Sequence, residues 1–262
     1  MSEPNPVRTA FRVAGVTVNI RSMRQALLAV IEDTKRGRGF CFFTLNLDHC
    51  AKLRTDLQFQ DAYRQARYVT ADGFPIVLLG KFNGVALKRT AGSDLMPPLC
   101  AEAARHDLPI FIIGPSAEVL QRACTRLVGH LPRLQIVGSY APGRNFDANS
   151  IDADVAIERI RQSRAQLCFI ALGAPRQEIF AARCLAQMPE TGFICVGAAL
   201  DFLAGTGTRA PRLLRDHGLE WLWRLLGDPR RLAARYLRCA AVFPLLAVEA
   251  IPKAISARLG RT

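Results

Sequence analysis

The stretch LCFIALGAPRQE, residues 167–178, contains the pattern on which the fold prediction rests. Residues 167–173 form a short apolar run, which is typical of a strand buried on both faces in a parallel sheet. Gly173 interrupts this pattern, and Pro175 stands where the first residue of a helix is expected. A buried strand followed by a glycine turn and a helix start is typical of a βαβ unit.

The same alternation extends over most of the chain. Further apolar runs that we interpret as strands lie at 41–45, 109–113, 134–138 and 192–197. Between the runs lie helical patterns, and two of them follow a serine that can cap a helix, Ser22 and Ser116. The sequence therefore predicts an α/β protein with a parallel sheet and helices on both faces.

The positive charge of the chain is large and concentrated towards its C-terminus. The formal net charge is +13 among 262 residues. Residues 208–262 hold 11 Lys and Arg against 4 Asp and Glu, whereas the first 207 residues hold 24 against 18. We therefore expect an anionic partner, which can be a nucleic acid, an anionic lipid surface or a phosphorylated substrate.

Cysteine spacing and apolar run lengths indicate the compartment. None of the eight cysteines form a CxxC pair, which argues against zinc sites and thioredoxin-like chemistry. We expect reduced, buried cysteines in a cytosolic protein. The first residues lack a signal-peptide pattern, and no apolar run reaches the roughly 20 residues of a membrane span. The chain is thus expected to be cytoplasmic, and peripheral to a membrane if it contacts one.

Glycine and polar residues follow the predicted strands, which is where ligands bind in such folds. Glycines let a ligand approach the backbone, and helix N-termini attract phosphate. The sequence therefore predicts a nucleotide or phosphate site at these strand ends. The candidate residues are Thr44, Asn46, Asp72, Gly114, Tyr140, Gly173, Pro175, Gln177, Glu178 and Asp201.

Three of these candidates allow two interpretations each. Asp72 ends a strand at a helix start, so it is either an N-cap or a general base at the mouth of a cleft. Thr44 and Asn46 have the alternate spacing that places two side chains on one side of a strand. They either orient a ligand or cap the next helix.

The segment LKRTAGSDLMP, residues 87–97, offers a further candidate group. Arg89 either clamps a phosphate or lies on the surface. Ser93 or Asp94 is expected to cap the helix that follows.

Two motif matches are interpreted as incidental. GTGTRA, residues 205–210, fits a dinucleotide-binding pattern, but the strand pattern before it is poor and Pro211 follows. Asp152 and Asp154 have the DxD spacing of a metal-binding pair, but they open an amphipathic helix, where acidic residues complement the helix dipole. The four histidines show no ligand spacing. We therefore expect no metal and no cofactor.

The stretch WLWRLLGDPRRLAARYLR, residues 221–238, suits three kinds of surface. Pro229 lies near the first position of a helix in which Arg231, Arg235 and Arg238 form one stripe. The neighbouring apolar stripe consists of Leu232, Tyr236, Cys239 and Phe243. Such a helix can bind nucleic acid, lie on an anionic membrane or cover a protein core.

The strand-end motifs also occur together, in one order, in a known family. They are TLN (44–46), TADG (70–73), AGSDLMP (91–97), LGAPRQE (172–178), VGAALDFLAG (196–205), RAP (209–211) and GLEWLWRLLGDPRRLAARYL (218–237). From about residue 11 to about residue 245, the chain resembles the WecG/TagA/CpsF family, glycosyltransferase family 26.

The resemblance implies an inverting transferase that moves a hexose from a UDP-sugar to a sugar on a polyprenyl diphosphate, in the synthesis of bacterial surface polymers. It implies a Rossmann-like core that needs no metal, and a C-terminal appendage that sits on the cytoplasmic face of the inner membrane and completes the site. With this resemblance, we interpret the tryptophans and the apolar stripe of residues 221–243 as anchors at the lipid surface, and the arginine stripe as a match for lipid headgroups and a lipid-diphosphate substrate. We accordingly expect a catalytic domain at 1–207 and a basic helical appendage at 208–262.

The resemblance also implies roles for individual residues. Asp72 matches the family's catalytic base, and Thr44 and Asn46 match its neighbouring polar pair. Among the implied substrate-binding residues are Arg89, Ser93, Asp94, Gln177, Arg224 and Arg231. The last two belong to the appendage and would face the diphosphates, where guanidinium groups can neutralise a departing UDP.

Four departures from the family pattern concern the choice of donor. They are TLN in place of TPN, Asp48-His49 in place of a glutamate, SYAPGRNF in place of a GYF-type segment, and Leu200 in place of an aromatic residue. We lean towards a neutral hexose such as glucose, as in xanthan-like polymers. The alternatives are UDP-N-acetylmannosamine and its uronic acid.

Two other classes of protein are weighed against the transferase. A basic nucleic-acid-binding module would leave the strand-end motifs unexplained, and a nicotinamide- or SAM-dependent enzyme would need glycines where TLNLDHC (44–50) stands. We therefore expect no nucleic acid among the partners. The family analogy and the apolar last helices suggest a homo-oligomer.

Overall fold

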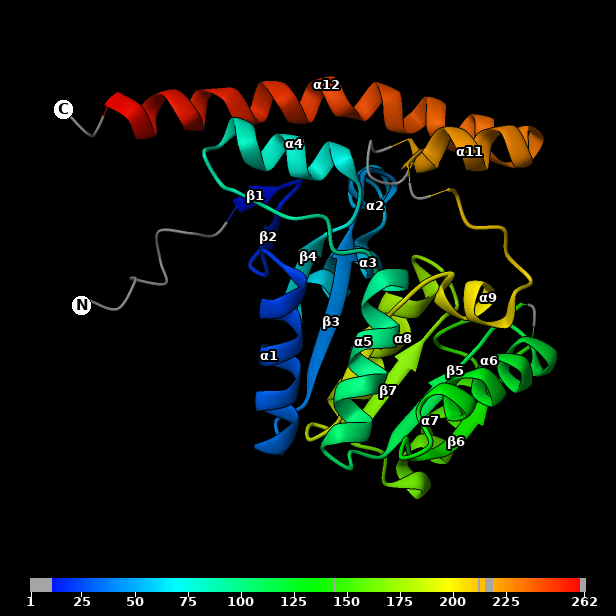
Figure 1. Cartoon of the computed structure of the whole chain (residues 1–262). Coiled ribbons are helices and arrows are strands. Elements are labelled where there is room, and N and C mark those ends of the chain that lie inside the picture. The colour runs from blue at the N-terminus through cyan, green and yellow to red at the C-terminus, as the bar shows by residue number, and fades with distance from the viewer. Residues whose placement is uncertain (1–10, 144, 212, 215–218, 260–262) are drawn as a thin grey trace.

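The computed structural model describes residues 11–259 except 144, 212 and 215–218, without the side chains of Arg224, Arg231 and residues 250–259. At its centre lies a six-stranded parallel sheet in the order β4-β3-β8-β7-β5-β6 (Figure 1). These strands are β3 Phe40–Leu45, β4 Ala66–Ala71, β5 Ile110–Ile113, β6 Ile136–Tyr140, β7 Leu167–Ile170 and β8 Gly192–Cys195. A short hairpin of β1 Phe11–Val13 and β2 Val16–Val18 lies next to β4.

Helices cover both faces of the sheet, because its strands bury side chains on both sides. Along β3, Phe40 and Phe42 belong to one apolar cluster, and Phe43 and Leu45 belong to the other. The first cluster includes α1 Met23–Lys35, α5 Gly92–Arg105, α6 Ala117–His130 and α9 Ala199–Ala204. The second includes α3 Leu57–Arg64, α7 Ile151–Ser163 and α8 Arg176–Gln187. The predicted α/β, Rossmann-like fold with helices on both faces is confirmed.

Helix starts were mostly predictable from capping chemistry. Ser22 and Ser116 cap α1 and α6, and their hydroxyls accept hydrogen bonds from backbone N–H groups three residues on. Pro229 is the first residue of its helix, as predicted. Pro175 is one position earlier than predicted, because it is the N-cap of α8 and not its first residue.

The prediction for the strand at 134–138 was wrong by two residues. Strand β6 spans Ile136–Tyr140 and is an edge strand with alternating exposure, so its position does not coincide with a continuous apolar run. The backbone N–H of Leu134 donates to Leu131 in a turn before the strand. Tyr140 is therefore the last residue of the strand and does not follow it.

The C-terminal helices lie across the carboxyl ends of β3 and β4. From these ends start α2 Leu47–Lys52 and α4 Phe74–Phe82. Helix α12 Pro229–Leu259 packs on both, and α11 Glu220–Gly227 packs beside the beginning of α12 (Figure 1). The chain after α9 thus returns to the end of the sheet where the candidate residues lie. The division into domains at 207 and 208 stays a prediction.

Helix α12 is apolar on two opposite sides. Leu232, Cys239, Val242 and Leu246 are buried on the inner side. Leu237, Leu245 and Val248 are half exposed or more, and helical geometry places them on the outer side. The sequence interpretation that the stripe of Leu232 and Cys239 anchors the chain at a lipid surface was wrong. That stripe faces the core because the helix docks on α2 and α4, and a different set of side chains faces outwards.

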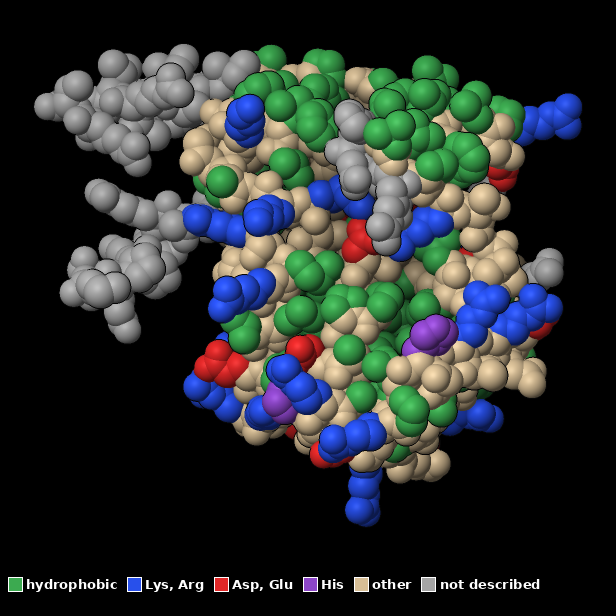
Figure 2. Space-filling model, in the orientation of Figure 1, with side chains coloured by type: hydrophobic (Ala, Val, Ile, Leu, Met, Phe, Trp, Pro, Cys, Tyr) green, Lys and Arg blue, Asp and Glu red, His purple; other side chains and the backbone are tan. Residues whose placement is uncertain are grey.

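The outward apolar side chains of the appendage continue onto neighbouring helices. Figure 2 shows hydrophobic side chains gathered along this end of the molecule, over α11 and α12. The exposed large apolar residues of α4, α11 and α12 are Phe74, Phe82, Trp221, Leu226, Leu237, Leu245 and Val248. No helix in the described part of the chain is both long and apolar enough to cross a membrane.

The cysteines are free thiols, as predicted. Seven of the eight are buried, and Cys124 is partly exposed. Burial raises the pKa of the Cys100 thiol to about 12, so this cysteine stays protonated at neutral pH.

Candidate active site

Asp72 directly follows the edge strand β4 and does not cap the helix behind it. Its backbone N–H donates to the carbonyl of Leu45 at 2.8 Å, which ties it to the end of β3. The N-cap of α4 is Gly73, with a φ of 101°, and no side chain caps this helix. The Asp72 side chain is a quarter exposed, and its Oδ1 lies 3.9 Å from Nη1 of Arg89. Of the two interpretations, the cap is therefore excluded.

Arg89 is the centre of a charged network at the carboxyl edge of the sheet. Its Nη2 donates to Oδ2 of Asp94 at 2.6 Å. Its Nη1 lies 3.8 Å from Oε2 of Glu220 in α11, close to the distance that separates it from Asp72. Arg209 forms a second ion pair with Asp94. The side chain of Arg89 is thus neither isolated nor merely on the surface.

The segment before α5 holds Arg89 next to the end of β4. The backbone N–H of Thr90 donates to Ala71, and the hydroxyl of Thr70 donates to the carbonyl of Thr90. The prediction that Ser93 or Asp94 caps the next helix was wrong, because α5 begins at Gly92 with Ala91 as its N-cap. Both residues lie in the first turn instead, where the Asp94 carboxylate can bind the two arginines.

The start of α5 is fixed by its contact with the end of β8. A Cβ on Gly92 would lie 2.8 Å from Cα of Val196, so only glycine allows this approach. The helix that carries Asp94 is therefore held against the carboxyl edge of the sheet.

Asn46 and Thr44 have different roles. Asn46 is the N-cap of α2, and its Oδ1 accepts a hydrogen bond from the N–H of His49 at 3.0 Å. Its side chain is partly exposed at the end of β3. Thr44 is buried within β3, and its carbonyl accepts a hydrogen bond from the Tyr63 hydroxyl at 3.4 Å. Capping is thus shown for Asn46, and contact with a ligand stays a prediction for both residues.

Gln177 ties two loops together at the ends of β7 and β8. Its Oε1 accepts hydrogen bonds from the N–H groups of Gly173 and Gly197, both at 3.2 Å. These glycines have φ values of 74° and 57°, and no atom lies within 4 Å of where a Cβ would be, so both loops border open space. The Gln177 side chain therefore shapes a backbone surface that a ligand can approach.

Glu178 lies beneath this surface and is fully buried. Its Oε1 accepts a hydrogen bond from Nε2 of Gln177 at 2.7 Å. Burial raises the pKa of Glu178 to about 7, although the hydrogen bond from Gln177 and the charge of Lys52 act in the opposite direction. In the conformation described, Glu178 supports the loop from within and does not face the open side.

Three further sequence candidates belong to other elements than Asp72 and Arg89. Tyr140 ends β6 at the opposite edge of the sheet, about 24 Å from β4 at the usual strand spacing. Gly114 packs against Leu120 and Leu200, where a side chain would clash. Asp201 lies in the first turn of α9. A substrate role for these three residues stays a prediction.

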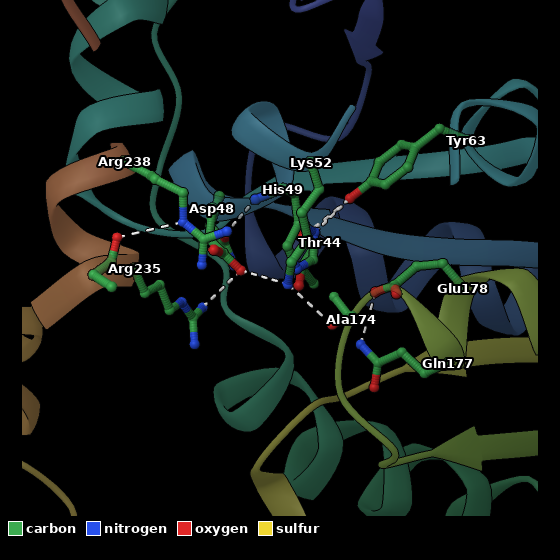
Figure 3. A network of polar contacts seen from close by, with 12 residues as sticks. Thr44, Asp48, His49, Lys52, Tyr63, Ala174, Gln177, Glu178, Arg235 and Arg238 are labelled. Carbon is green, nitrogen blue, oxygen red and sulfur yellow. Dashed lines mark hydrogen bonds and ion pairs between the residues drawn. The ribbon is translucent and has the colours of Figure 1, made fainter. Parts of the chain in front are cut away.

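A second polar network includes residues that the sequence interpretation missed (Figure 3). Asp48 is nearly buried and forms ion pairs with Lys52 of its own helix at 2.7 Å and with Arg235 of α12 at 3.2 Å. Nζ of Lys52 also donates to the carbonyl of Ala174 at 3.0 Å. Burial raises the pKa of Asp48, but Lys52 and Arg235 outweigh it, so the pKa lies below its ordinary value.

This second network joins the appendage to the sheet edge. The spacing of Asp48 and Lys52 by four residues is a sequence signal for an ion pair on one face of a helix. The partnership with Arg235 has no local signal, because 187 residues of sequence separate it from Asp48. Arg235 was assigned to a solvent-facing or lipid-facing stripe, and it is bound to a core carboxylate instead.

Two of the predicted arginines are not described in full. Arg224 belongs to α11 and Arg231 to α12, but their side chains lie outside the described residues. Their predicted contact with diphosphates stays a prediction.

The two motif matches set aside in the sequence have structural roles. Ser150 caps α7, and Asp152 and Asp154 lie in its first turn, as interpreted. Asp152 binds the Tyr140 hydroxyl and the N–H of Gly143, and Asp154 pairs with Arg183. The GTGTRA segment follows helix α9 and not a strand. Within the described residues, no three His, Cys, Asp or Glu side chains are grouped as metal ligands are.

The fold and the charged network define a class of protein. It is a Rossmann-like α/β protein with its candidate site at the carboxyl ends of the parallel strands, where such folds bind their ligands. A family model described as "Glycosyl transferase WecG/TagA/CpsF family" matches residues 11–256. The chain therefore belongs to the WecG/TagA/CpsF family of glycosyltransferases of surface-polysaccharide biosynthesis. Its reaction has a sugar donor and an acceptor substrate.

Proposed function

We propose that the chain transfers a hexose, with inversion, from a UDP-sugar to a sugar carried on a polyprenyl diphosphate. The observation that carries the proposal is the position of Asp72, which is partly exposed at a strand end, beside Arg89 and outside any helix cap. An aspartate in this position can accept the proton of the acceptor hydroxyl as its oxygen attacks the anomeric carbon. UDP then leaves from the opposite side of that carbon.

The departing UDP needs compensation for its negative charge. Arg89 presents a guanidinium beside Asp72, and open glycine backbone lies at residues 173 and 197. Arg224 and Arg231 of the appendage are proposed to contribute further positive charge. Guanidinium groups bind phosphate oxygens through two parallel hydrogen bonds, so they can stabilise this leaving group. We therefore propose a reaction that needs no metal.

The proposed donor is UDP-glucose, with UDP-N-acetylmannosamine and UDP-N-acetylmannosaminuronate as the alternatives. The preference rests on SYAPGRNF, residues 139–146, which replaces a segment near the expected sugar pocket. The structure describes this segment, apart from residue 144, as the end of β6 and the loop after it.

The proposed location is the cytoplasmic face of the inner membrane. Support comes from the exposed apolar side chains of α4, α11 and α12 and from the excess of basic residues after position 207. Such a surface can enter the lipid headgroup region while its arginines bind anionic headgroups. The acceptor is itself a lipid and would reach the site from that side.

The test is a transfer assay with a panel of UDP-sugars and a synthetic polyprenyl-diphosphate-linked sugar, with and without EDTA. We expect transfer that survives EDTA and is lost, by about 100-fold or more, in Asp72→Asn. UDP binding should remain in that variant, and Asp61→Asn, at an exposed carboxylate of α3, should behave like the wild type. Normal transfer by Asp72→Asn would refute the assignment of the base.

The comparison of transfer with and without EDTA tests separately whether the reaction needs a metal ion. Strong inhibition by EDTA would contradict the metal-independent proposal. Asp154→Asn, which alters the DxD pair of α7 at the residue that pairs with Arg183, is expected to retain transfer within about twofold, since no catalytic charge would be lost.

A further inference from the structure

Glu220 connects the appendage to the proposed base through Arg89. It is the first residue of α11, and its side chain is one fifth exposed. Its Oε2 lies 3.8 Å from Nη1 of Arg89, and Oδ1 of Asp72 lies 3.9 Å from the same nitrogen. The two carboxylate oxygens are therefore at most about 8 Å apart, which is within the screening length of physiological salt.

The orientation of Arg89 is restricted on its other side. Its Nη2 is engaged by Asp94, which also pairs with Arg209 from the segment that leads to the appendage. Asp94 lies on the helix whose first residue, Gly92, is packed against Val196. With one nitrogen of the guanidinium held there, the other is turned towards Asp72 and Glu220. A change at Glu220 therefore acts on Asp72 through Arg89.

We propose that Glu220 is a positioning residue through which the docking of α11 sets the orientation of Arg89 and the negative charge beside Asp72. The inference rests on the proposed function, in which Asp72 is the base. Glu220 acts through Arg89 and is not assigned contact with the reacting atoms. In this arrangement the base has its working environment only while the appendage is docked.

Among the described side chains, the charged and titratable groups around Asp72 come from several elements. Arg89 faces it directly, and Asp94 and Glu220 face it across Arg89. Tyr63 of α3 is close enough for the charge of Asp72 to contribute to its raised pKa, behind the larger effects of burial and Glu178. Arg209 lies behind Asp94. Glu220 is the carboxylate in this set that belongs to α11.

A pH profile separates this role from a merely structural one. A negative charge makes a neighbouring carboxylate harder to ionise, so its removal moves the acidic limb of the activity profile to lower pH. For two charges about 8 Å apart in a partly hydrated site, the expected shift is about 0.3–0.7 of a pH unit. Loss of packing alone would lower the rate at every pH and leave the limb in place.

The experiment compares the full-length wild type with Glu220→Gln, Glu220→Ala and Glu220→Asp. Glu249→Gln, an exposed carboxylate on α12, is the matched control. We measure the acidic limb of kcat/KM for sugar transfer, and hydrogen exchange of residues 84–91 and 220–227. Glu220→Gln and Glu220→Ala should lower kcat/KM about fivefold, shift the limb down and increase exchange in both segments. In Glu220→Asp and in the control, the acidic limb of the kcat/KM profile should lie at the same pH as in the wild type.

Several outcomes would overturn the proposal. If the acidic limb of the pH profile is the same in Glu220→Gln, Glu220→Ala and the wild type, the charge of Glu220 does not affect the ionisation of Asp72. An equal shift in Glu220→Asp would show that geometry and not charge is responsible. If the wild type transfers none of the donor sugars, the proposed function fails, but hydrogen exchange still tests the positioning role of Glu220. Unchanged hydrogen exchange in Glu220→Gln and Glu220→Ala would refute that role. Increased exchange in both segments would support it.

Discussion

At the scale of single residues, the position of Asp72 depends on the glycine that follows it. With φ at 101° and ψ at 151°, Gly73 adopts a backbone conformation that other residues rarely reach. The chain turns there into α4, so the cap position falls on Gly73 and the carboxylate of Asp72 stays beside Arg89. The sequence TADG predicted a functional aspartate or a cap, and the backbone of one glycine decides against the cap.

Gln177 should contribute measurably to stability as well as to the shape of the loops. Gln177→Ala removes the acceptor of two backbone N–H groups and a donor to the buried Glu178. We expect a loss of about 2 kcal/mol in the free energy of unfolding, because these groups lose partners in a partly buried site. Urea denaturation measures this loss.

An exposed glutamine provides the control for Gln177→Ala. Gln121→Ala alters an exposed position on α6 and should change stability by less than about 0.5 kcal/mol. Equal stability of Gln177→Ala and the wild type would show that the loops hold their shape without this side chain.

Glu178 should make the stability of the protein depend on pH. Its pKa is raised from 4.5 to about 7 in the folded protein, so the folded state holds a proton that the unfolded state releases earlier. The resulting stabilisation is complete below pH 4.5 and is lost as the pH rises to about 7. Relative to Glu178→Gln, the wild type should lose about 3 kcal/mol over this range.

Denaturation curves at a series of pH values test this expectation. Glu190→Gln, at an exposed turn position, should keep the pH dependence of the wild type. Parallel curves for the wild type and Glu178→Gln would contradict a carboxyl group that is protonated in the folded state.

Residue roles that depend on local spacing could be predicted, and those that depend on distant pairing could not. The Ser22 and Ser116 caps follow from one turn of sequence. The link between Glu220 and Arg89 joins segments 131 positions apart, and nothing in either segment identifies the partner. The fully buried state of Glu178 was also unpredictable, since a glutamate in a motif is ordinarily expected to face a ligand or water.

At the scale of elements, the docking of α12 on α2 depends on Asp48. Asp48→Asn would leave Lys52 and Arg235 next to each other without their common carboxylate. We expect a loss of about 2 kcal/mol, less than for a fully buried pair because both cations are about a third exposed. Hydrogen exchange should increase in the first half of α12, and urea denaturation measures the total loss.

The exposed ion pair of α3 is the control for this variant. Asp61→Asn breaks a similar contact, with Arg64, in which both side chains are mostly exposed. It should cost no more than about 0.5 kcal/mol. If Asp48→Asn is equally mild and α12 stays protected, apolar packing alone holds the helix in place.

Among the strands, burial affects how well an apolar run of the sequence predicts the element. The central strands β3, β7 and β8 are buried on both faces, and each begins within one residue of its predicted apolar run. The runs at 167–173 and 192–197 extend three and two residues beyond the ends of β7 and β8, because Ala171, Leu172 and Val196 after these strands are also buried. At the edge of the sheet, β6 is half exposed along its length, and the apolar run of the sequence missed its end by two residues. The burial of a strand therefore makes its first residue predictable from an apolar run, but not the residue at which the strand ends.

At the scale of the whole molecule, the outer apolar side of α12 is predicted to bind lipid. Leu237 is 71% exposed, and its substitution by Glu places a charge on the surface that we expect to enter the headgroup region. Leu237→Glu should weaken binding to vesicles of phosphatidylglycerol and phosphatidylcholine about tenfold, because one leucine contributes about 1.5 kcal/mol there. Co-sedimentation with vesicles measures the binding.

The control for vesicle binding carries the same change elsewhere. Leu28→Glu alters another well-exposed leucine, 61% accessible, on α1 and should bind vesicles as the wild type does. Binding of the wild type should fall at high salt, since arginines screened from the headgroups attract them less. Equal binding by Leu237→Glu and Leu28→Glu would contradict the proposed orientation. A change of oligomeric state in Leu237→Glu would instead assign this surface to a second copy of the chain.

The two apolar sides of α12 also limit which of its positions can accept substitutions during evolution. One quarter of its circumference is filled by Leu232, Val242 and Leu246 against the core, and the opposite quarter carries Leu237 and Leu245. Of the remaining flanks, one carries Arg238 and Glu249, and the other carries Ala233 and Ala240, which are exposed. Freely variable positions should therefore be confined to two narrow strips along the helix, and a saturation mutagenesis map of α12 should repeat this fourfold pattern.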